Sequence, residues 1–302
     1  MPNFPVTIYT HLRPDLDACA SVWAARTYIP GAKESQLRFV PANWNGRGRG
    51  RKPDDLLLDI SSGMKGEKDE SGKLHSCFAL LMKRYAPPEE RAALRDLIDL
   101  IDAMDSTGNA YKTLAPELTP EHARAFSWTG LGAVLSALAV APGADDRSVV
   151  SAMCLILDGF RSRALAYQQK CAMANNPNIV KRYTAQTGEV VCLVTGAQGM
   201  NSVLFEQGAH IRFVIYTSES GREYGVNRND LAPSLDIHNS FVQAVLTKAQ
   251  EAGQWFVHPN GFLLAWGTSK SPAEAPSRVR PEDLAQAYVD YLDSMAKTDA
   301  ST

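Results

Sequence analysis

The sequence has few cysteines, no excess of either charge and no long hydrophobic run, and each shortage excludes a class of protein. Its five cysteines are odd in number and widely spaced, without a C-x-x-C pair, which excludes a disulfide framework and a zinc-binding or redox motif. The 31 basic and 33 acidic residues give a net charge of −2. This balance excludes a protein that binds nucleic acid through an overall positive charge. No apolar stretch approaches a membrane span, and the start of the chain does not resemble a signal peptide. We therefore expect a cytoplasmic protein with reduced thiols and no membrane contact.

What the sequence does contain is an alternation of short apolar runs with helical periodicity, which is typical of an α/β protein. We expect an N-terminal parallel-sheet domain over 1–127, a helical connector over 128–180 and a smaller C-terminal α/β domain over 181–302. The runs that predict strands are 5–11, 37–41, 56–60, 190–195, 211–217 and 262–267. The segments that predict helices are 18–27, 75–85, 88–104, 129–140, 146–173, 202–207, 240–252 and 281–295.

The run from Asn45 to Lys52 reads N-G-R-G-R-G-R-K and places four positive charges among glycines. Such a loop is able to follow a phosphate backbone at close range. A solvated surface loop explains the same composition, since Asp54 and Asp55 follow at once. The run therefore offers a nucleic-acid contact as one interpretation only.

The most informative stretch follows the first predicted strand. There His11, Asp15 and Asp17 form the pattern H-x-x-x-D-x-D in the loop that leads into a helix. Loops at the carboxyl ends of strands are where open α/β sheets bind ligands. One imidazole and two carboxylates suit Mn²⁺ or another octahedral divalent ion. The structural alternative is a Pro-Asp turn with an aspartate at a helix N-terminus.

Residues 11–21 read H-L-R-P-D-L-D-A-C-A-S, and this run resembles the first motif of the DHH phosphoesterase superfamily, H-x-x-P-D-x-D-A-x-x-S. Asp59, in L-L-D-I, is similar to the aspartate of the second motif. The segment I-D-A-M-D, which ends at Asp105, resembles the fourth motif of the melanocyte-proliferating-gene-type exonuclease branch. K-L-H-S-C-F-A-L at 73–80 and F-V-H-P-N-G-F at 256–262 are similar to further segments of that branch.

This resemblance implies catalytic roles for Asp15, Asp17 and Asp59 in a phosphoesterase that uses Mn²⁺ or Mg²⁺. It also implies that a C-terminal domain holds the far end of the substrate. The expected metal ligands are His11, Asp15, Asp17, Asp59, Asp105 and His75. The expected substrate-binding residues are His258, Asn260, Gly261, Lys270 and Lys65. Read without the resemblance, H-P-N-G is a turn signal, and Trp255 and Trp266 are either core residues or surfaces for a base.

The Asp-His-His motif that gives the superfamily its name does not occur in the chain. Hydrolysis with two metal ions needs both ions about 3.5–4 Å apart, and bridging ligands set that distance. One ion is therefore expected rather than two, held by His11, Asp15, Asp59 and either Asp105 or Asp102. In a second alternative His75 supplies a displaced ligand. In a third, Lys65 or Lys68 replaces the cation and leaves a metal-free pocket.

The function expected is metal-dependent hydrolysis of a nucleotide, a short oligonucleotide or another small phosphorylated substrate. The alternative is a catalytically inactive protein of the same descent that binds a phosphorylated ligand or a nucleic acid. The sequence does not identify the substrate or the oligomeric state.

Overall fold

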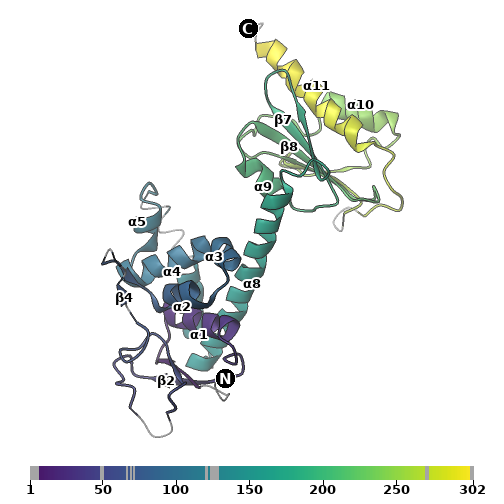
Figure 1. Ribbon diagram of the computed structural model, residues 1–302. Coiled ribbons are helices and arrows are strands. Elements are labelled where there is room, and N and C mark those ends of the chain that lie inside the picture. The colour runs from purple at the N-terminus through teal and green to yellow at the C-terminus, as the bar shows by residue number, and fades with distance from the viewer. Residues whose placement is uncertain are drawn as a thin grey trace. The chain divides into compact units, whose positions relative to one another are not determined.

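The computed structural model describes residues 7–47, 51–65, 67–68, 70, 72–119, 122, 129–268 and 272–299 (Figure 1). The chain divides into two compact units, Met1–Leu165 and Ala166–Thr302. The division falls within helix α8 (Asp146–Met173), inside the segment where the sequence predicts a helical connector. The fold is α/β, as predicted, with a parallel sheet in the first unit, a helical middle and a mixed sheet in the second.

The first unit is built on three parallel strands in the order β2-β1-β3. Their bounds are β1 Thr7–His11, β2 Gln36–Val40 and β3 Leu56–Leu57. Strand β3 is shorter than the predicted run because the chain turns sharply after it. Leu58 forms an isolated bridge with Met64, and Gly63 donates its backbone N–H to the carbonyl of Ile60.

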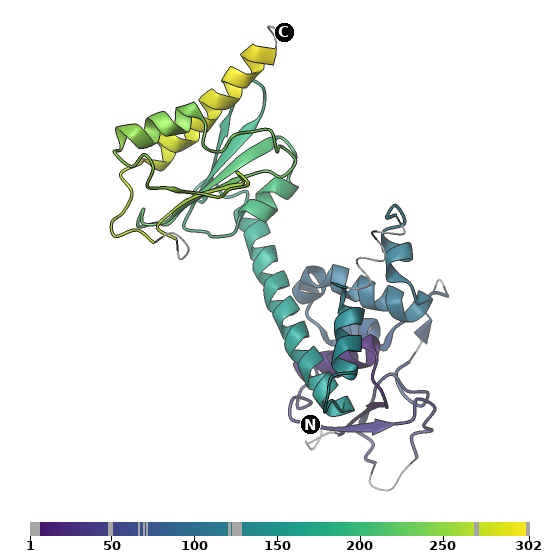
Figure 2. The same ribbon diagram turned by 180° about the vertical axis from the view of Figure 1, so that it is seen from behind.

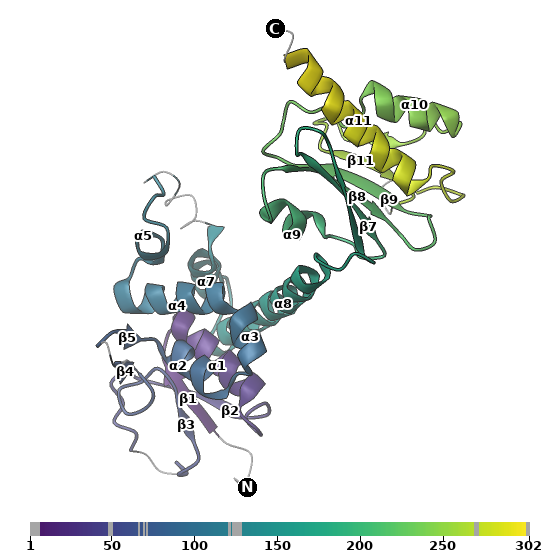
Figure 3. The same ribbon diagram turned by 45° about the horizontal axis from the view of Figure 1, so that its top comes forward.

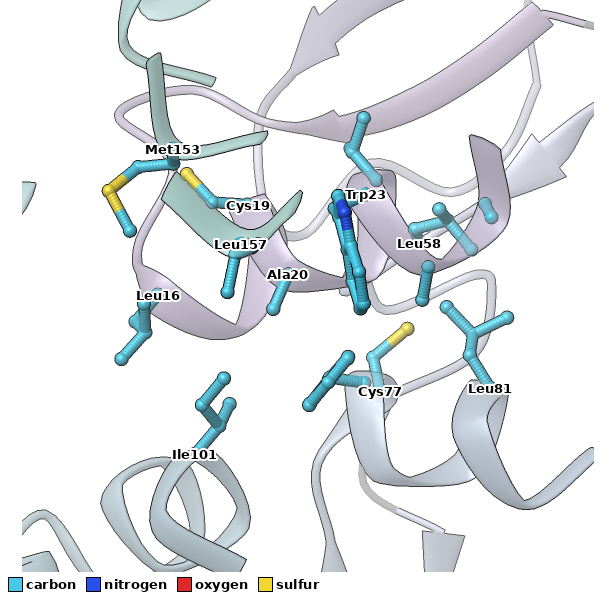
Figure 4. Close-up of a cluster of buried hydrophobic side chains, with 14 of the residues drawn as sticks. Leu16, Cys19, Ala20, Trp23, Leu58, Cys77, Leu81, Ile101, Met153 and Leu157 are labelled. Atoms are coloured by element: carbon cyan, nitrogen blue, oxygen red, sulfur yellow. The ribbon is translucent and has the colours of Figure 1, made fainter. Parts of the chain in front are cut away.

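Helices of the first unit bury the sheet and each other. Helix α1 (Leu16–Tyr28) is buried from Leu16 to Ala25, which fits its small and apolar residues on every side. Figure 4 shows the core that it forms with α2, α4 and α8, where Trp23 lies near Cys77. The remaining elements are α2 Cys77–Tyr85, α3 Pro88–Ala93, α4 Arg95–Thr107, α5 Ala110–Leu114, α7 Leu131–Ala139 and the hairpin β4 Glu67–Lys68 with β5 Leu74–His75.

The predicted helix over 88–104 is two helices in the structure. They meet at Leu94, whose backbone leaves the helical region at φ −96° and ψ 11°. Leu94 is 2% exposed and belongs to the core of this unit. Burial of this side chain accompanies the break, which periodicity along the sequence does not reveal.

The second unit contains a six-stranded sheet in the order β10-β11-β9-β8-β7-β6 (Figures 2 and 3). Strands β7 and β8 are parallel and the other neighbours are antiparallel. One face packs against α10 and α11, and the other carries a separate apolar cluster with α9. The bounds are β6 Val180–Thr184, β7 Val190–Thr195, α9 Asn201–Glu206, β8 Ile211–Thr217, β9 Tyr224–Arg228, α10 Ser240–Lys248, β10 Phe256–Val257, β11 Leu263–Trp266 and α11 Pro281–Asp299.

Across these described ranges, no helix combines the length and the hydrophobicity that crossing a lipid bilayer requires.

Candidate metal centre

Three side chains of the first unit meet at the carboxyl edge of its sheet. Nε2 of His11 lies 3.0 Å from Oδ2 of Asp59 and 3.6 Å from Oδ2 of Asp15. The three candidate ligand atoms all lie within 4.8 Å of one another. His11 ends β1, and Asp59 follows the neighbouring parallel strand β3. Because parallel strands end at the same edge of a sheet, the fold joins residues 48 positions apart in the chain.

Asp15 has a structural role beside its place in this group. It is the N-cap of α1, and its Oδ1 accepts the backbone N–H of Ala18 at 2.9 Å. Its second oxygen remains directed to His11. The structural alternative for this aspartate, a helix cap, is thus present, and it coexists with a position in the candidate metal group.

Asp59 is held in an uncommon backbone conformation. Its φ is +52°, in the left-handed region that non-glycine residues rarely adopt, and its side chain is 1% exposed. The loop folds back closely beneath it: a Cβ at Gly63 would lie 2.3 Å from the carbonyl oxygen of Leu57. The N–H of Asp59 bonds to the carbonyl of Met64 at 3.0 Å. Backbone strain of this kind persists where surrounding contacts fix it, and it is frequent at functional sites.

Charge is concentrated in this group. The hydrogen bonds of His11 to Asp15 and Asp59 raise its pKa to about 10. Without a bound ion the imidazole is therefore protonated at neutral pH. Burial acts to raise the pKa of Asp15, but the hydrogen bonds from His11 and from Ala18 outweigh burial, and its pKa is lowered.

Lys65 supplies a second cation. Its Nζ lies 3.0 Å from Oδ1 of Asp59, so His11 and Lys65 engage different oxygens of one carboxylate. The Lys65 side chain is 44% exposed, which leaves it able to swing into solvent. Burial acts to lower the pKa of Lys65, but the contact with Asp59 and the negative charges of Asp59, Asp15 and Asp105 together outweigh burial, and the pKa is raised.

Asp17 lies beside this group but is engaged elsewhere. Its two oxygens accept the backbone N–H groups of Cys77 and Phe78 at 2.9 and 2.8 Å, at the start of α2. Burial, reinforced by the charge of Asp59, raises the pKa of Asp17 to about 8, although both N–H groups act in the opposite direction. The group of three candidate ligands does not include Asp17. In the structure it joins the first turn of α1 to the first turn of α2.

Helix α4 contributes two aspartates to the surroundings. Asp102 accepts hydrogen bonds from Nδ1 of His75 at 3.0 Å, from Nζ of Lys73 at 3.1 Å and from the N–H of Ser76 at 2.7 Å. His75 is thereby paired with Asp102 and is outside the group of three. Burial, then the negative charges of Asp59 and Asp15, raise the pKa of Asp105. The group of three candidate ligands does not include Asp105.

The segment at 73–80 assigns Lys73 no role as a ligand or substrate contact, yet Lys73 pairs with Asp102. The i, i+3 spacing of Asp102 and Asp105 was a usable signal that both face one side of α4. No local pattern indicates the lysine, because the contact depends on the β4–β5 hairpin that places Lys73 beside the helix.

The predicted substrate residues of the second unit form the turn between β10 and β11. Nδ1 of His258 accepts the N–H of Asn260 at 3.2 Å, and the carbonyl of His258 accepts the N–H of Gly261 at 2.8 Å. Gly261 has φ +64°, which favours glycine. The His258 ring packs against Phe262 with centroids 4.1 Å apart. Lys270 lies outside the described residues, so its predicted role is not placed.

The arginine-glycine run is described only at its ends, because residues 48–50 lie outside the described ranges. Nη1 of Arg51 donates to the carbonyl of Gly46 at 2.8 Å, and Trp44 donates its indole N–H to the carbonyl of Arg47. A contact of this run with nucleic acid stays a prediction.

Comparison with solved structures gives distant matches. No family model and no curated protein matches the chain. A solved structure of an uncharacterized protein from Helicobacter pylori G27 is similar with 11% identity and a TM-score of 0.23, covering 95% of this chain and 98% of that one. A structure described as the DHH domain of a member of a family of ribosomal proteins is similar with 13% identity and a TM-score of 0.31, covering 96% of this chain and 86% of that one. The chain thus has a distant structural match to a DHH-domain protein.

Proposed function

We propose that the first unit is a metal-dependent phosphoesterase that uses one Mn²⁺ or Mg²⁺ ion held by His11, Asp15 and Asp59. The observation that carries this proposal is the convergence of one imidazole nitrogen and two carboxylate oxygens within 4.8 Å. This donor set suits a hard or borderline divalent cation, with water completing the coordination. The substrate class that we propose is a nucleotide, a short oligonucleotide or another small phosphorylated molecule.

The residues fit such an ion in charge as well as in type. Asp15 and Asp59 carry two negative charges, and burial together with these charges raises the pKa of Asp105. His11 must lose its proton before its nitrogen can coordinate an ion. The free energy of that deprotonation reduces the net free energy of metal binding. When bound, an ion at this site lowers the pKa of a coordinated water and neutralises charge that develops on phosphate oxygens.

Other features of the site are positions and roles of the chain's own side chains. Asp15 is fixed by its bond to Ala18, and Asp59 is fixed by the turn that follows β3, so both carboxylates are preorganised. Lys65 is a flexible ammonium beside Asp59 that is able to turn toward a phosphate oxygen. Asp17 holds α2 against α1 and so keeps the walls of the site together.

The test is release of phosphate or mononucleotide from a panel of dinucleotides and phosphomonoesters, with and without Mn²⁺. We expect Asp15→Ala to remove Mn²⁺-dependent turnover, and calorimetry to show weaker Mn²⁺ binding by the same variant. The matched control is Asp99→Asn, an exposed aspartate on α4, which should behave as wild type. Equal product release by wild type and Asp15→Ala would reject the proposal.

One observation favours a second candidate, a protein that binds a phosphorylated ligand without hydrolysing it. Nζ of Lys65 already lies 3.0 Å from Oδ1 of Asp59, where it neutralises a carboxylate that a metal ion would otherwise neutralise. This candidate predicts that a phosphorylated ligand raises the melting temperature, that EDTA does not reverse the rise, and that no product forms. A requirement for Mn²⁺ in the thermal response would exclude it.

A further inference from the structure

The second unit contains a hollow above Gly225. Neither the backbone conformation of this residue nor a close neighbouring atom requires a glycine at this position. Gly225 is the second residue of β9, which lies between β11 and β8, and its φ is not in the left-handed region. A Cβ built on Gly225 would meet no heavy atom within 4 Å. Glycine inside a strand costs about 0.5–1 kcal/mol relative to alanine. Such a glycine often marks a place where a ligand approaches the backbone closely.

The strand register shows what surrounds this hollow. Gly225 pairs with Tyr216 of β8 and with Ala265 of β11. Directly paired residues of antiparallel strands point to the same face of a sheet. Tyr224 and Val226, the neighbours of Gly225 along β9, point to the opposite face and pack in the cluster with α10 and α11. The hollow is therefore on the face that carries α9, between an aromatic ring and a methyl group.

A pocket of about 160 Å³ occupies this place. Its lining includes Asn201, Asn227 and Gln198, and none of its lining residues is charged. Nε2 of Gln198 donates to Oε2 of Glu223 at 2.9 Å, so Asn201 and Asn227 are the amides that remain for a ligand. Within the described ranges, the side chains of Asn201 and Asn227 make no hydrogen bond. Each carboxamide offers donors and an acceptor, which suits a neutral ligand that carries both kinds of group on its edge.

The volume of the pocket and the chemistry of its lining both suit a planar heterocycle. Pockets for drug-sized ligands measure about 300–1,000 Å³, so this pocket fits a smaller group. Asparagine and glutamine pair with base edges through two hydrogen bonds, and an aromatic ring such as that of Tyr216 stacks on bases. The backbone at Gly225 leaves the thickness of a ring free above the sheet.

A cation lies at the rim of the same pocket. Gly199 lines the pocket, and a Cβ at this position would lie 2.7 Å from Nζ of Lys170. No ion pair of Lys170 occurs with any residue that the structure describes. An ammonium beside a neutral pocket suits a ligand whose uncharged ring bears a phosphate.

We propose that the hollow over Gly225 binds the base of a nucleoside monophosphate, and that Lys170 holds its phosphate. The site lies within the second unit and does not depend on the proposed hydrolysis or on a metal ion. The proposal gives a ligand to the face of the sheet that carries α9. The motif at 258–261 lies in the turn between β10 and β11 and assigns no ligand to that face.

The decisive experiment fills the hollow. AMP, GMP, CMP and UMP are titrated into the full-length protein by calorimetry in EDTA, which keeps metal ions out of the first unit. We expect at least one monophosphate to bind wild type, and Gly225→Val and Gly225→Ala to weaken that binding by about tenfold or more. Both variants should melt at a higher temperature than wild type, because the strand loses an unfavourable glycine. Loss of binding therefore cannot be attributed to unfolding.

The matched control is Thr184→Val on β6, which replaces a hydroxyl with a methyl group at an exposed strand position at the far edge of the sheet. This variant should bind the monophosphates as wild type does. The proposal is overturned if no monophosphate binds wild type at millimolar concentration, or if Gly225→Val binds as tightly as wild type.

Lys170→Gln tests the phosphate contact separately. This variant should weaken the binding of the monophosphate by about fivefold to tenfold and leave the binding of the matching nucleoside unchanged. Inorganic phosphate alone should bind much more weakly than the monophosphate. Equal losses for nucleoside and monophosphate, or no loss for either, would show that Lys170 does not hold the phosphate.

Discussion

At the scale of single residues, the candidate metal centre depends on Gly63, which has no side chain to bind a metal ion but allows the tight turn beside Asp59. A Cβ at Gly63 would lie 2.3 Å from the carbonyl oxygen of Leu57 and 2.4 Å from its Cβ. We expect Gly63→Ala to lower the free energy of unfolding by about 1–3 kcal/mol, because the turn must open to relieve the clash. The same movement displaces Asp59, so Mn²⁺ affinity should fall as well. Urea unfolding and calorimetry with Mn²⁺ measure the two effects.

Gly159 provides the contrast. It lies inside α8, and a Cβ there would meet nothing within 4 Å. Gly159→Ala should therefore raise the free energy of unfolding by about 0.5–1 kcal/mol, since alanine favours the helix. Mn²⁺ affinity should not change. An equal loss of stability in both variants would contradict the steric explanation.

Also at the scale of single residues, a variant of Lys65 tests whether this lysine competes with a metal ion for Asp59. Removing its charge with Lys65→Met should tighten Mn²⁺ binding by about threefold to tenfold, because the ammonium no longer competes for Asp59. If Lys65 also contacts the phosphate, KM for the substrate should rise while Mn²⁺ binds more tightly. Mn²⁺ titrations and steady-state kinetics on one preparation measure both quantities. Weaker Mn²⁺ binding in Lys65→Met would show that the lysine does not compete with the ion.

At the scale of elements, one partly buried ion pair joins three helices of the first unit. Glu90 of α3 accepts hydrogen bonds from Nε and Nη2 of Arg161 on α8, both at 2.6 Å, and from the hydroxyl of Tyr28 on α1 at 2.7 Å. Arg161 lowers the pKa of Glu90 against the opposing effect of burial. The native state therefore binds the Glu90 proton less readily than the unfolded chain does.

This shift gives a pH dependence with a definite sign. A carboxylate with a lowered pKa stabilises the native state above the unfolded pKa, and that contribution is lost as pH falls through the native pKa. Glu90→Gln should cost about 1 kcal/mol of unfolding free energy near pH 7, a modest value because Arg161 is one-third exposed. The difference from wild type should shrink as pH falls below 4.5, the ordinary pKa of a glutamate.

Urea unfolding across this pH range measures the difference. Glu89→Gln, one position earlier in α3 and exposed, is the control and should stay near wild type at every pH. A difference between wild type and Glu90→Gln that is the same at all pH values would contradict the linkage.

Also at the scale of elements, local patterns predicted many of the helices and strands. The bounds of β7, β8 and α8 match the predicted segments. Strands β6 and β9 were missed, because V-K-R-Y-T and Y-G-V-N-R mix charged, polar and small residues without a clear alternation. Their neighbours in the sheet decide that they are strands, since each gains a ladder of hydrogen bonds there.

At the scale of the whole molecule, the two units have separate hydrophobic clusters. The clusters of the second unit contain no residue of the first unit's core among the described residues. We therefore expect calorimetry to resolve two unfolding transitions. Mn²⁺ should raise only one of them, by about 2.7 kcal/mol of unfolding free energy at a hundredfold excess over Kd.

Two conservative variants identify the transitions. Ile101→Val, in the core of the first unit, should lower the transition that Mn²⁺ raises, and Ile215→Val, in the second unit, should lower the other. Each change is expected to cost about 0.5–1.5 kcal/mol. If Ile215→Val lowered the Mn²⁺-sensitive transition by the same amount, the two units would unfold as one.

The sequence by itself determined the α/β alternation and the local spacing of His11 and Asp15, because both depend on residues a few positions apart. It also indicated Asp59, through a motif after an apolar run. Only the tertiary structure decided that Asp59 meets His11, that Lys65 reaches the same carboxylate and that Asp17 bonds to α2. Contacts across such distances depend on which strands pair, where a loop closes and how the helices pack. Local periodicity carries no record of these.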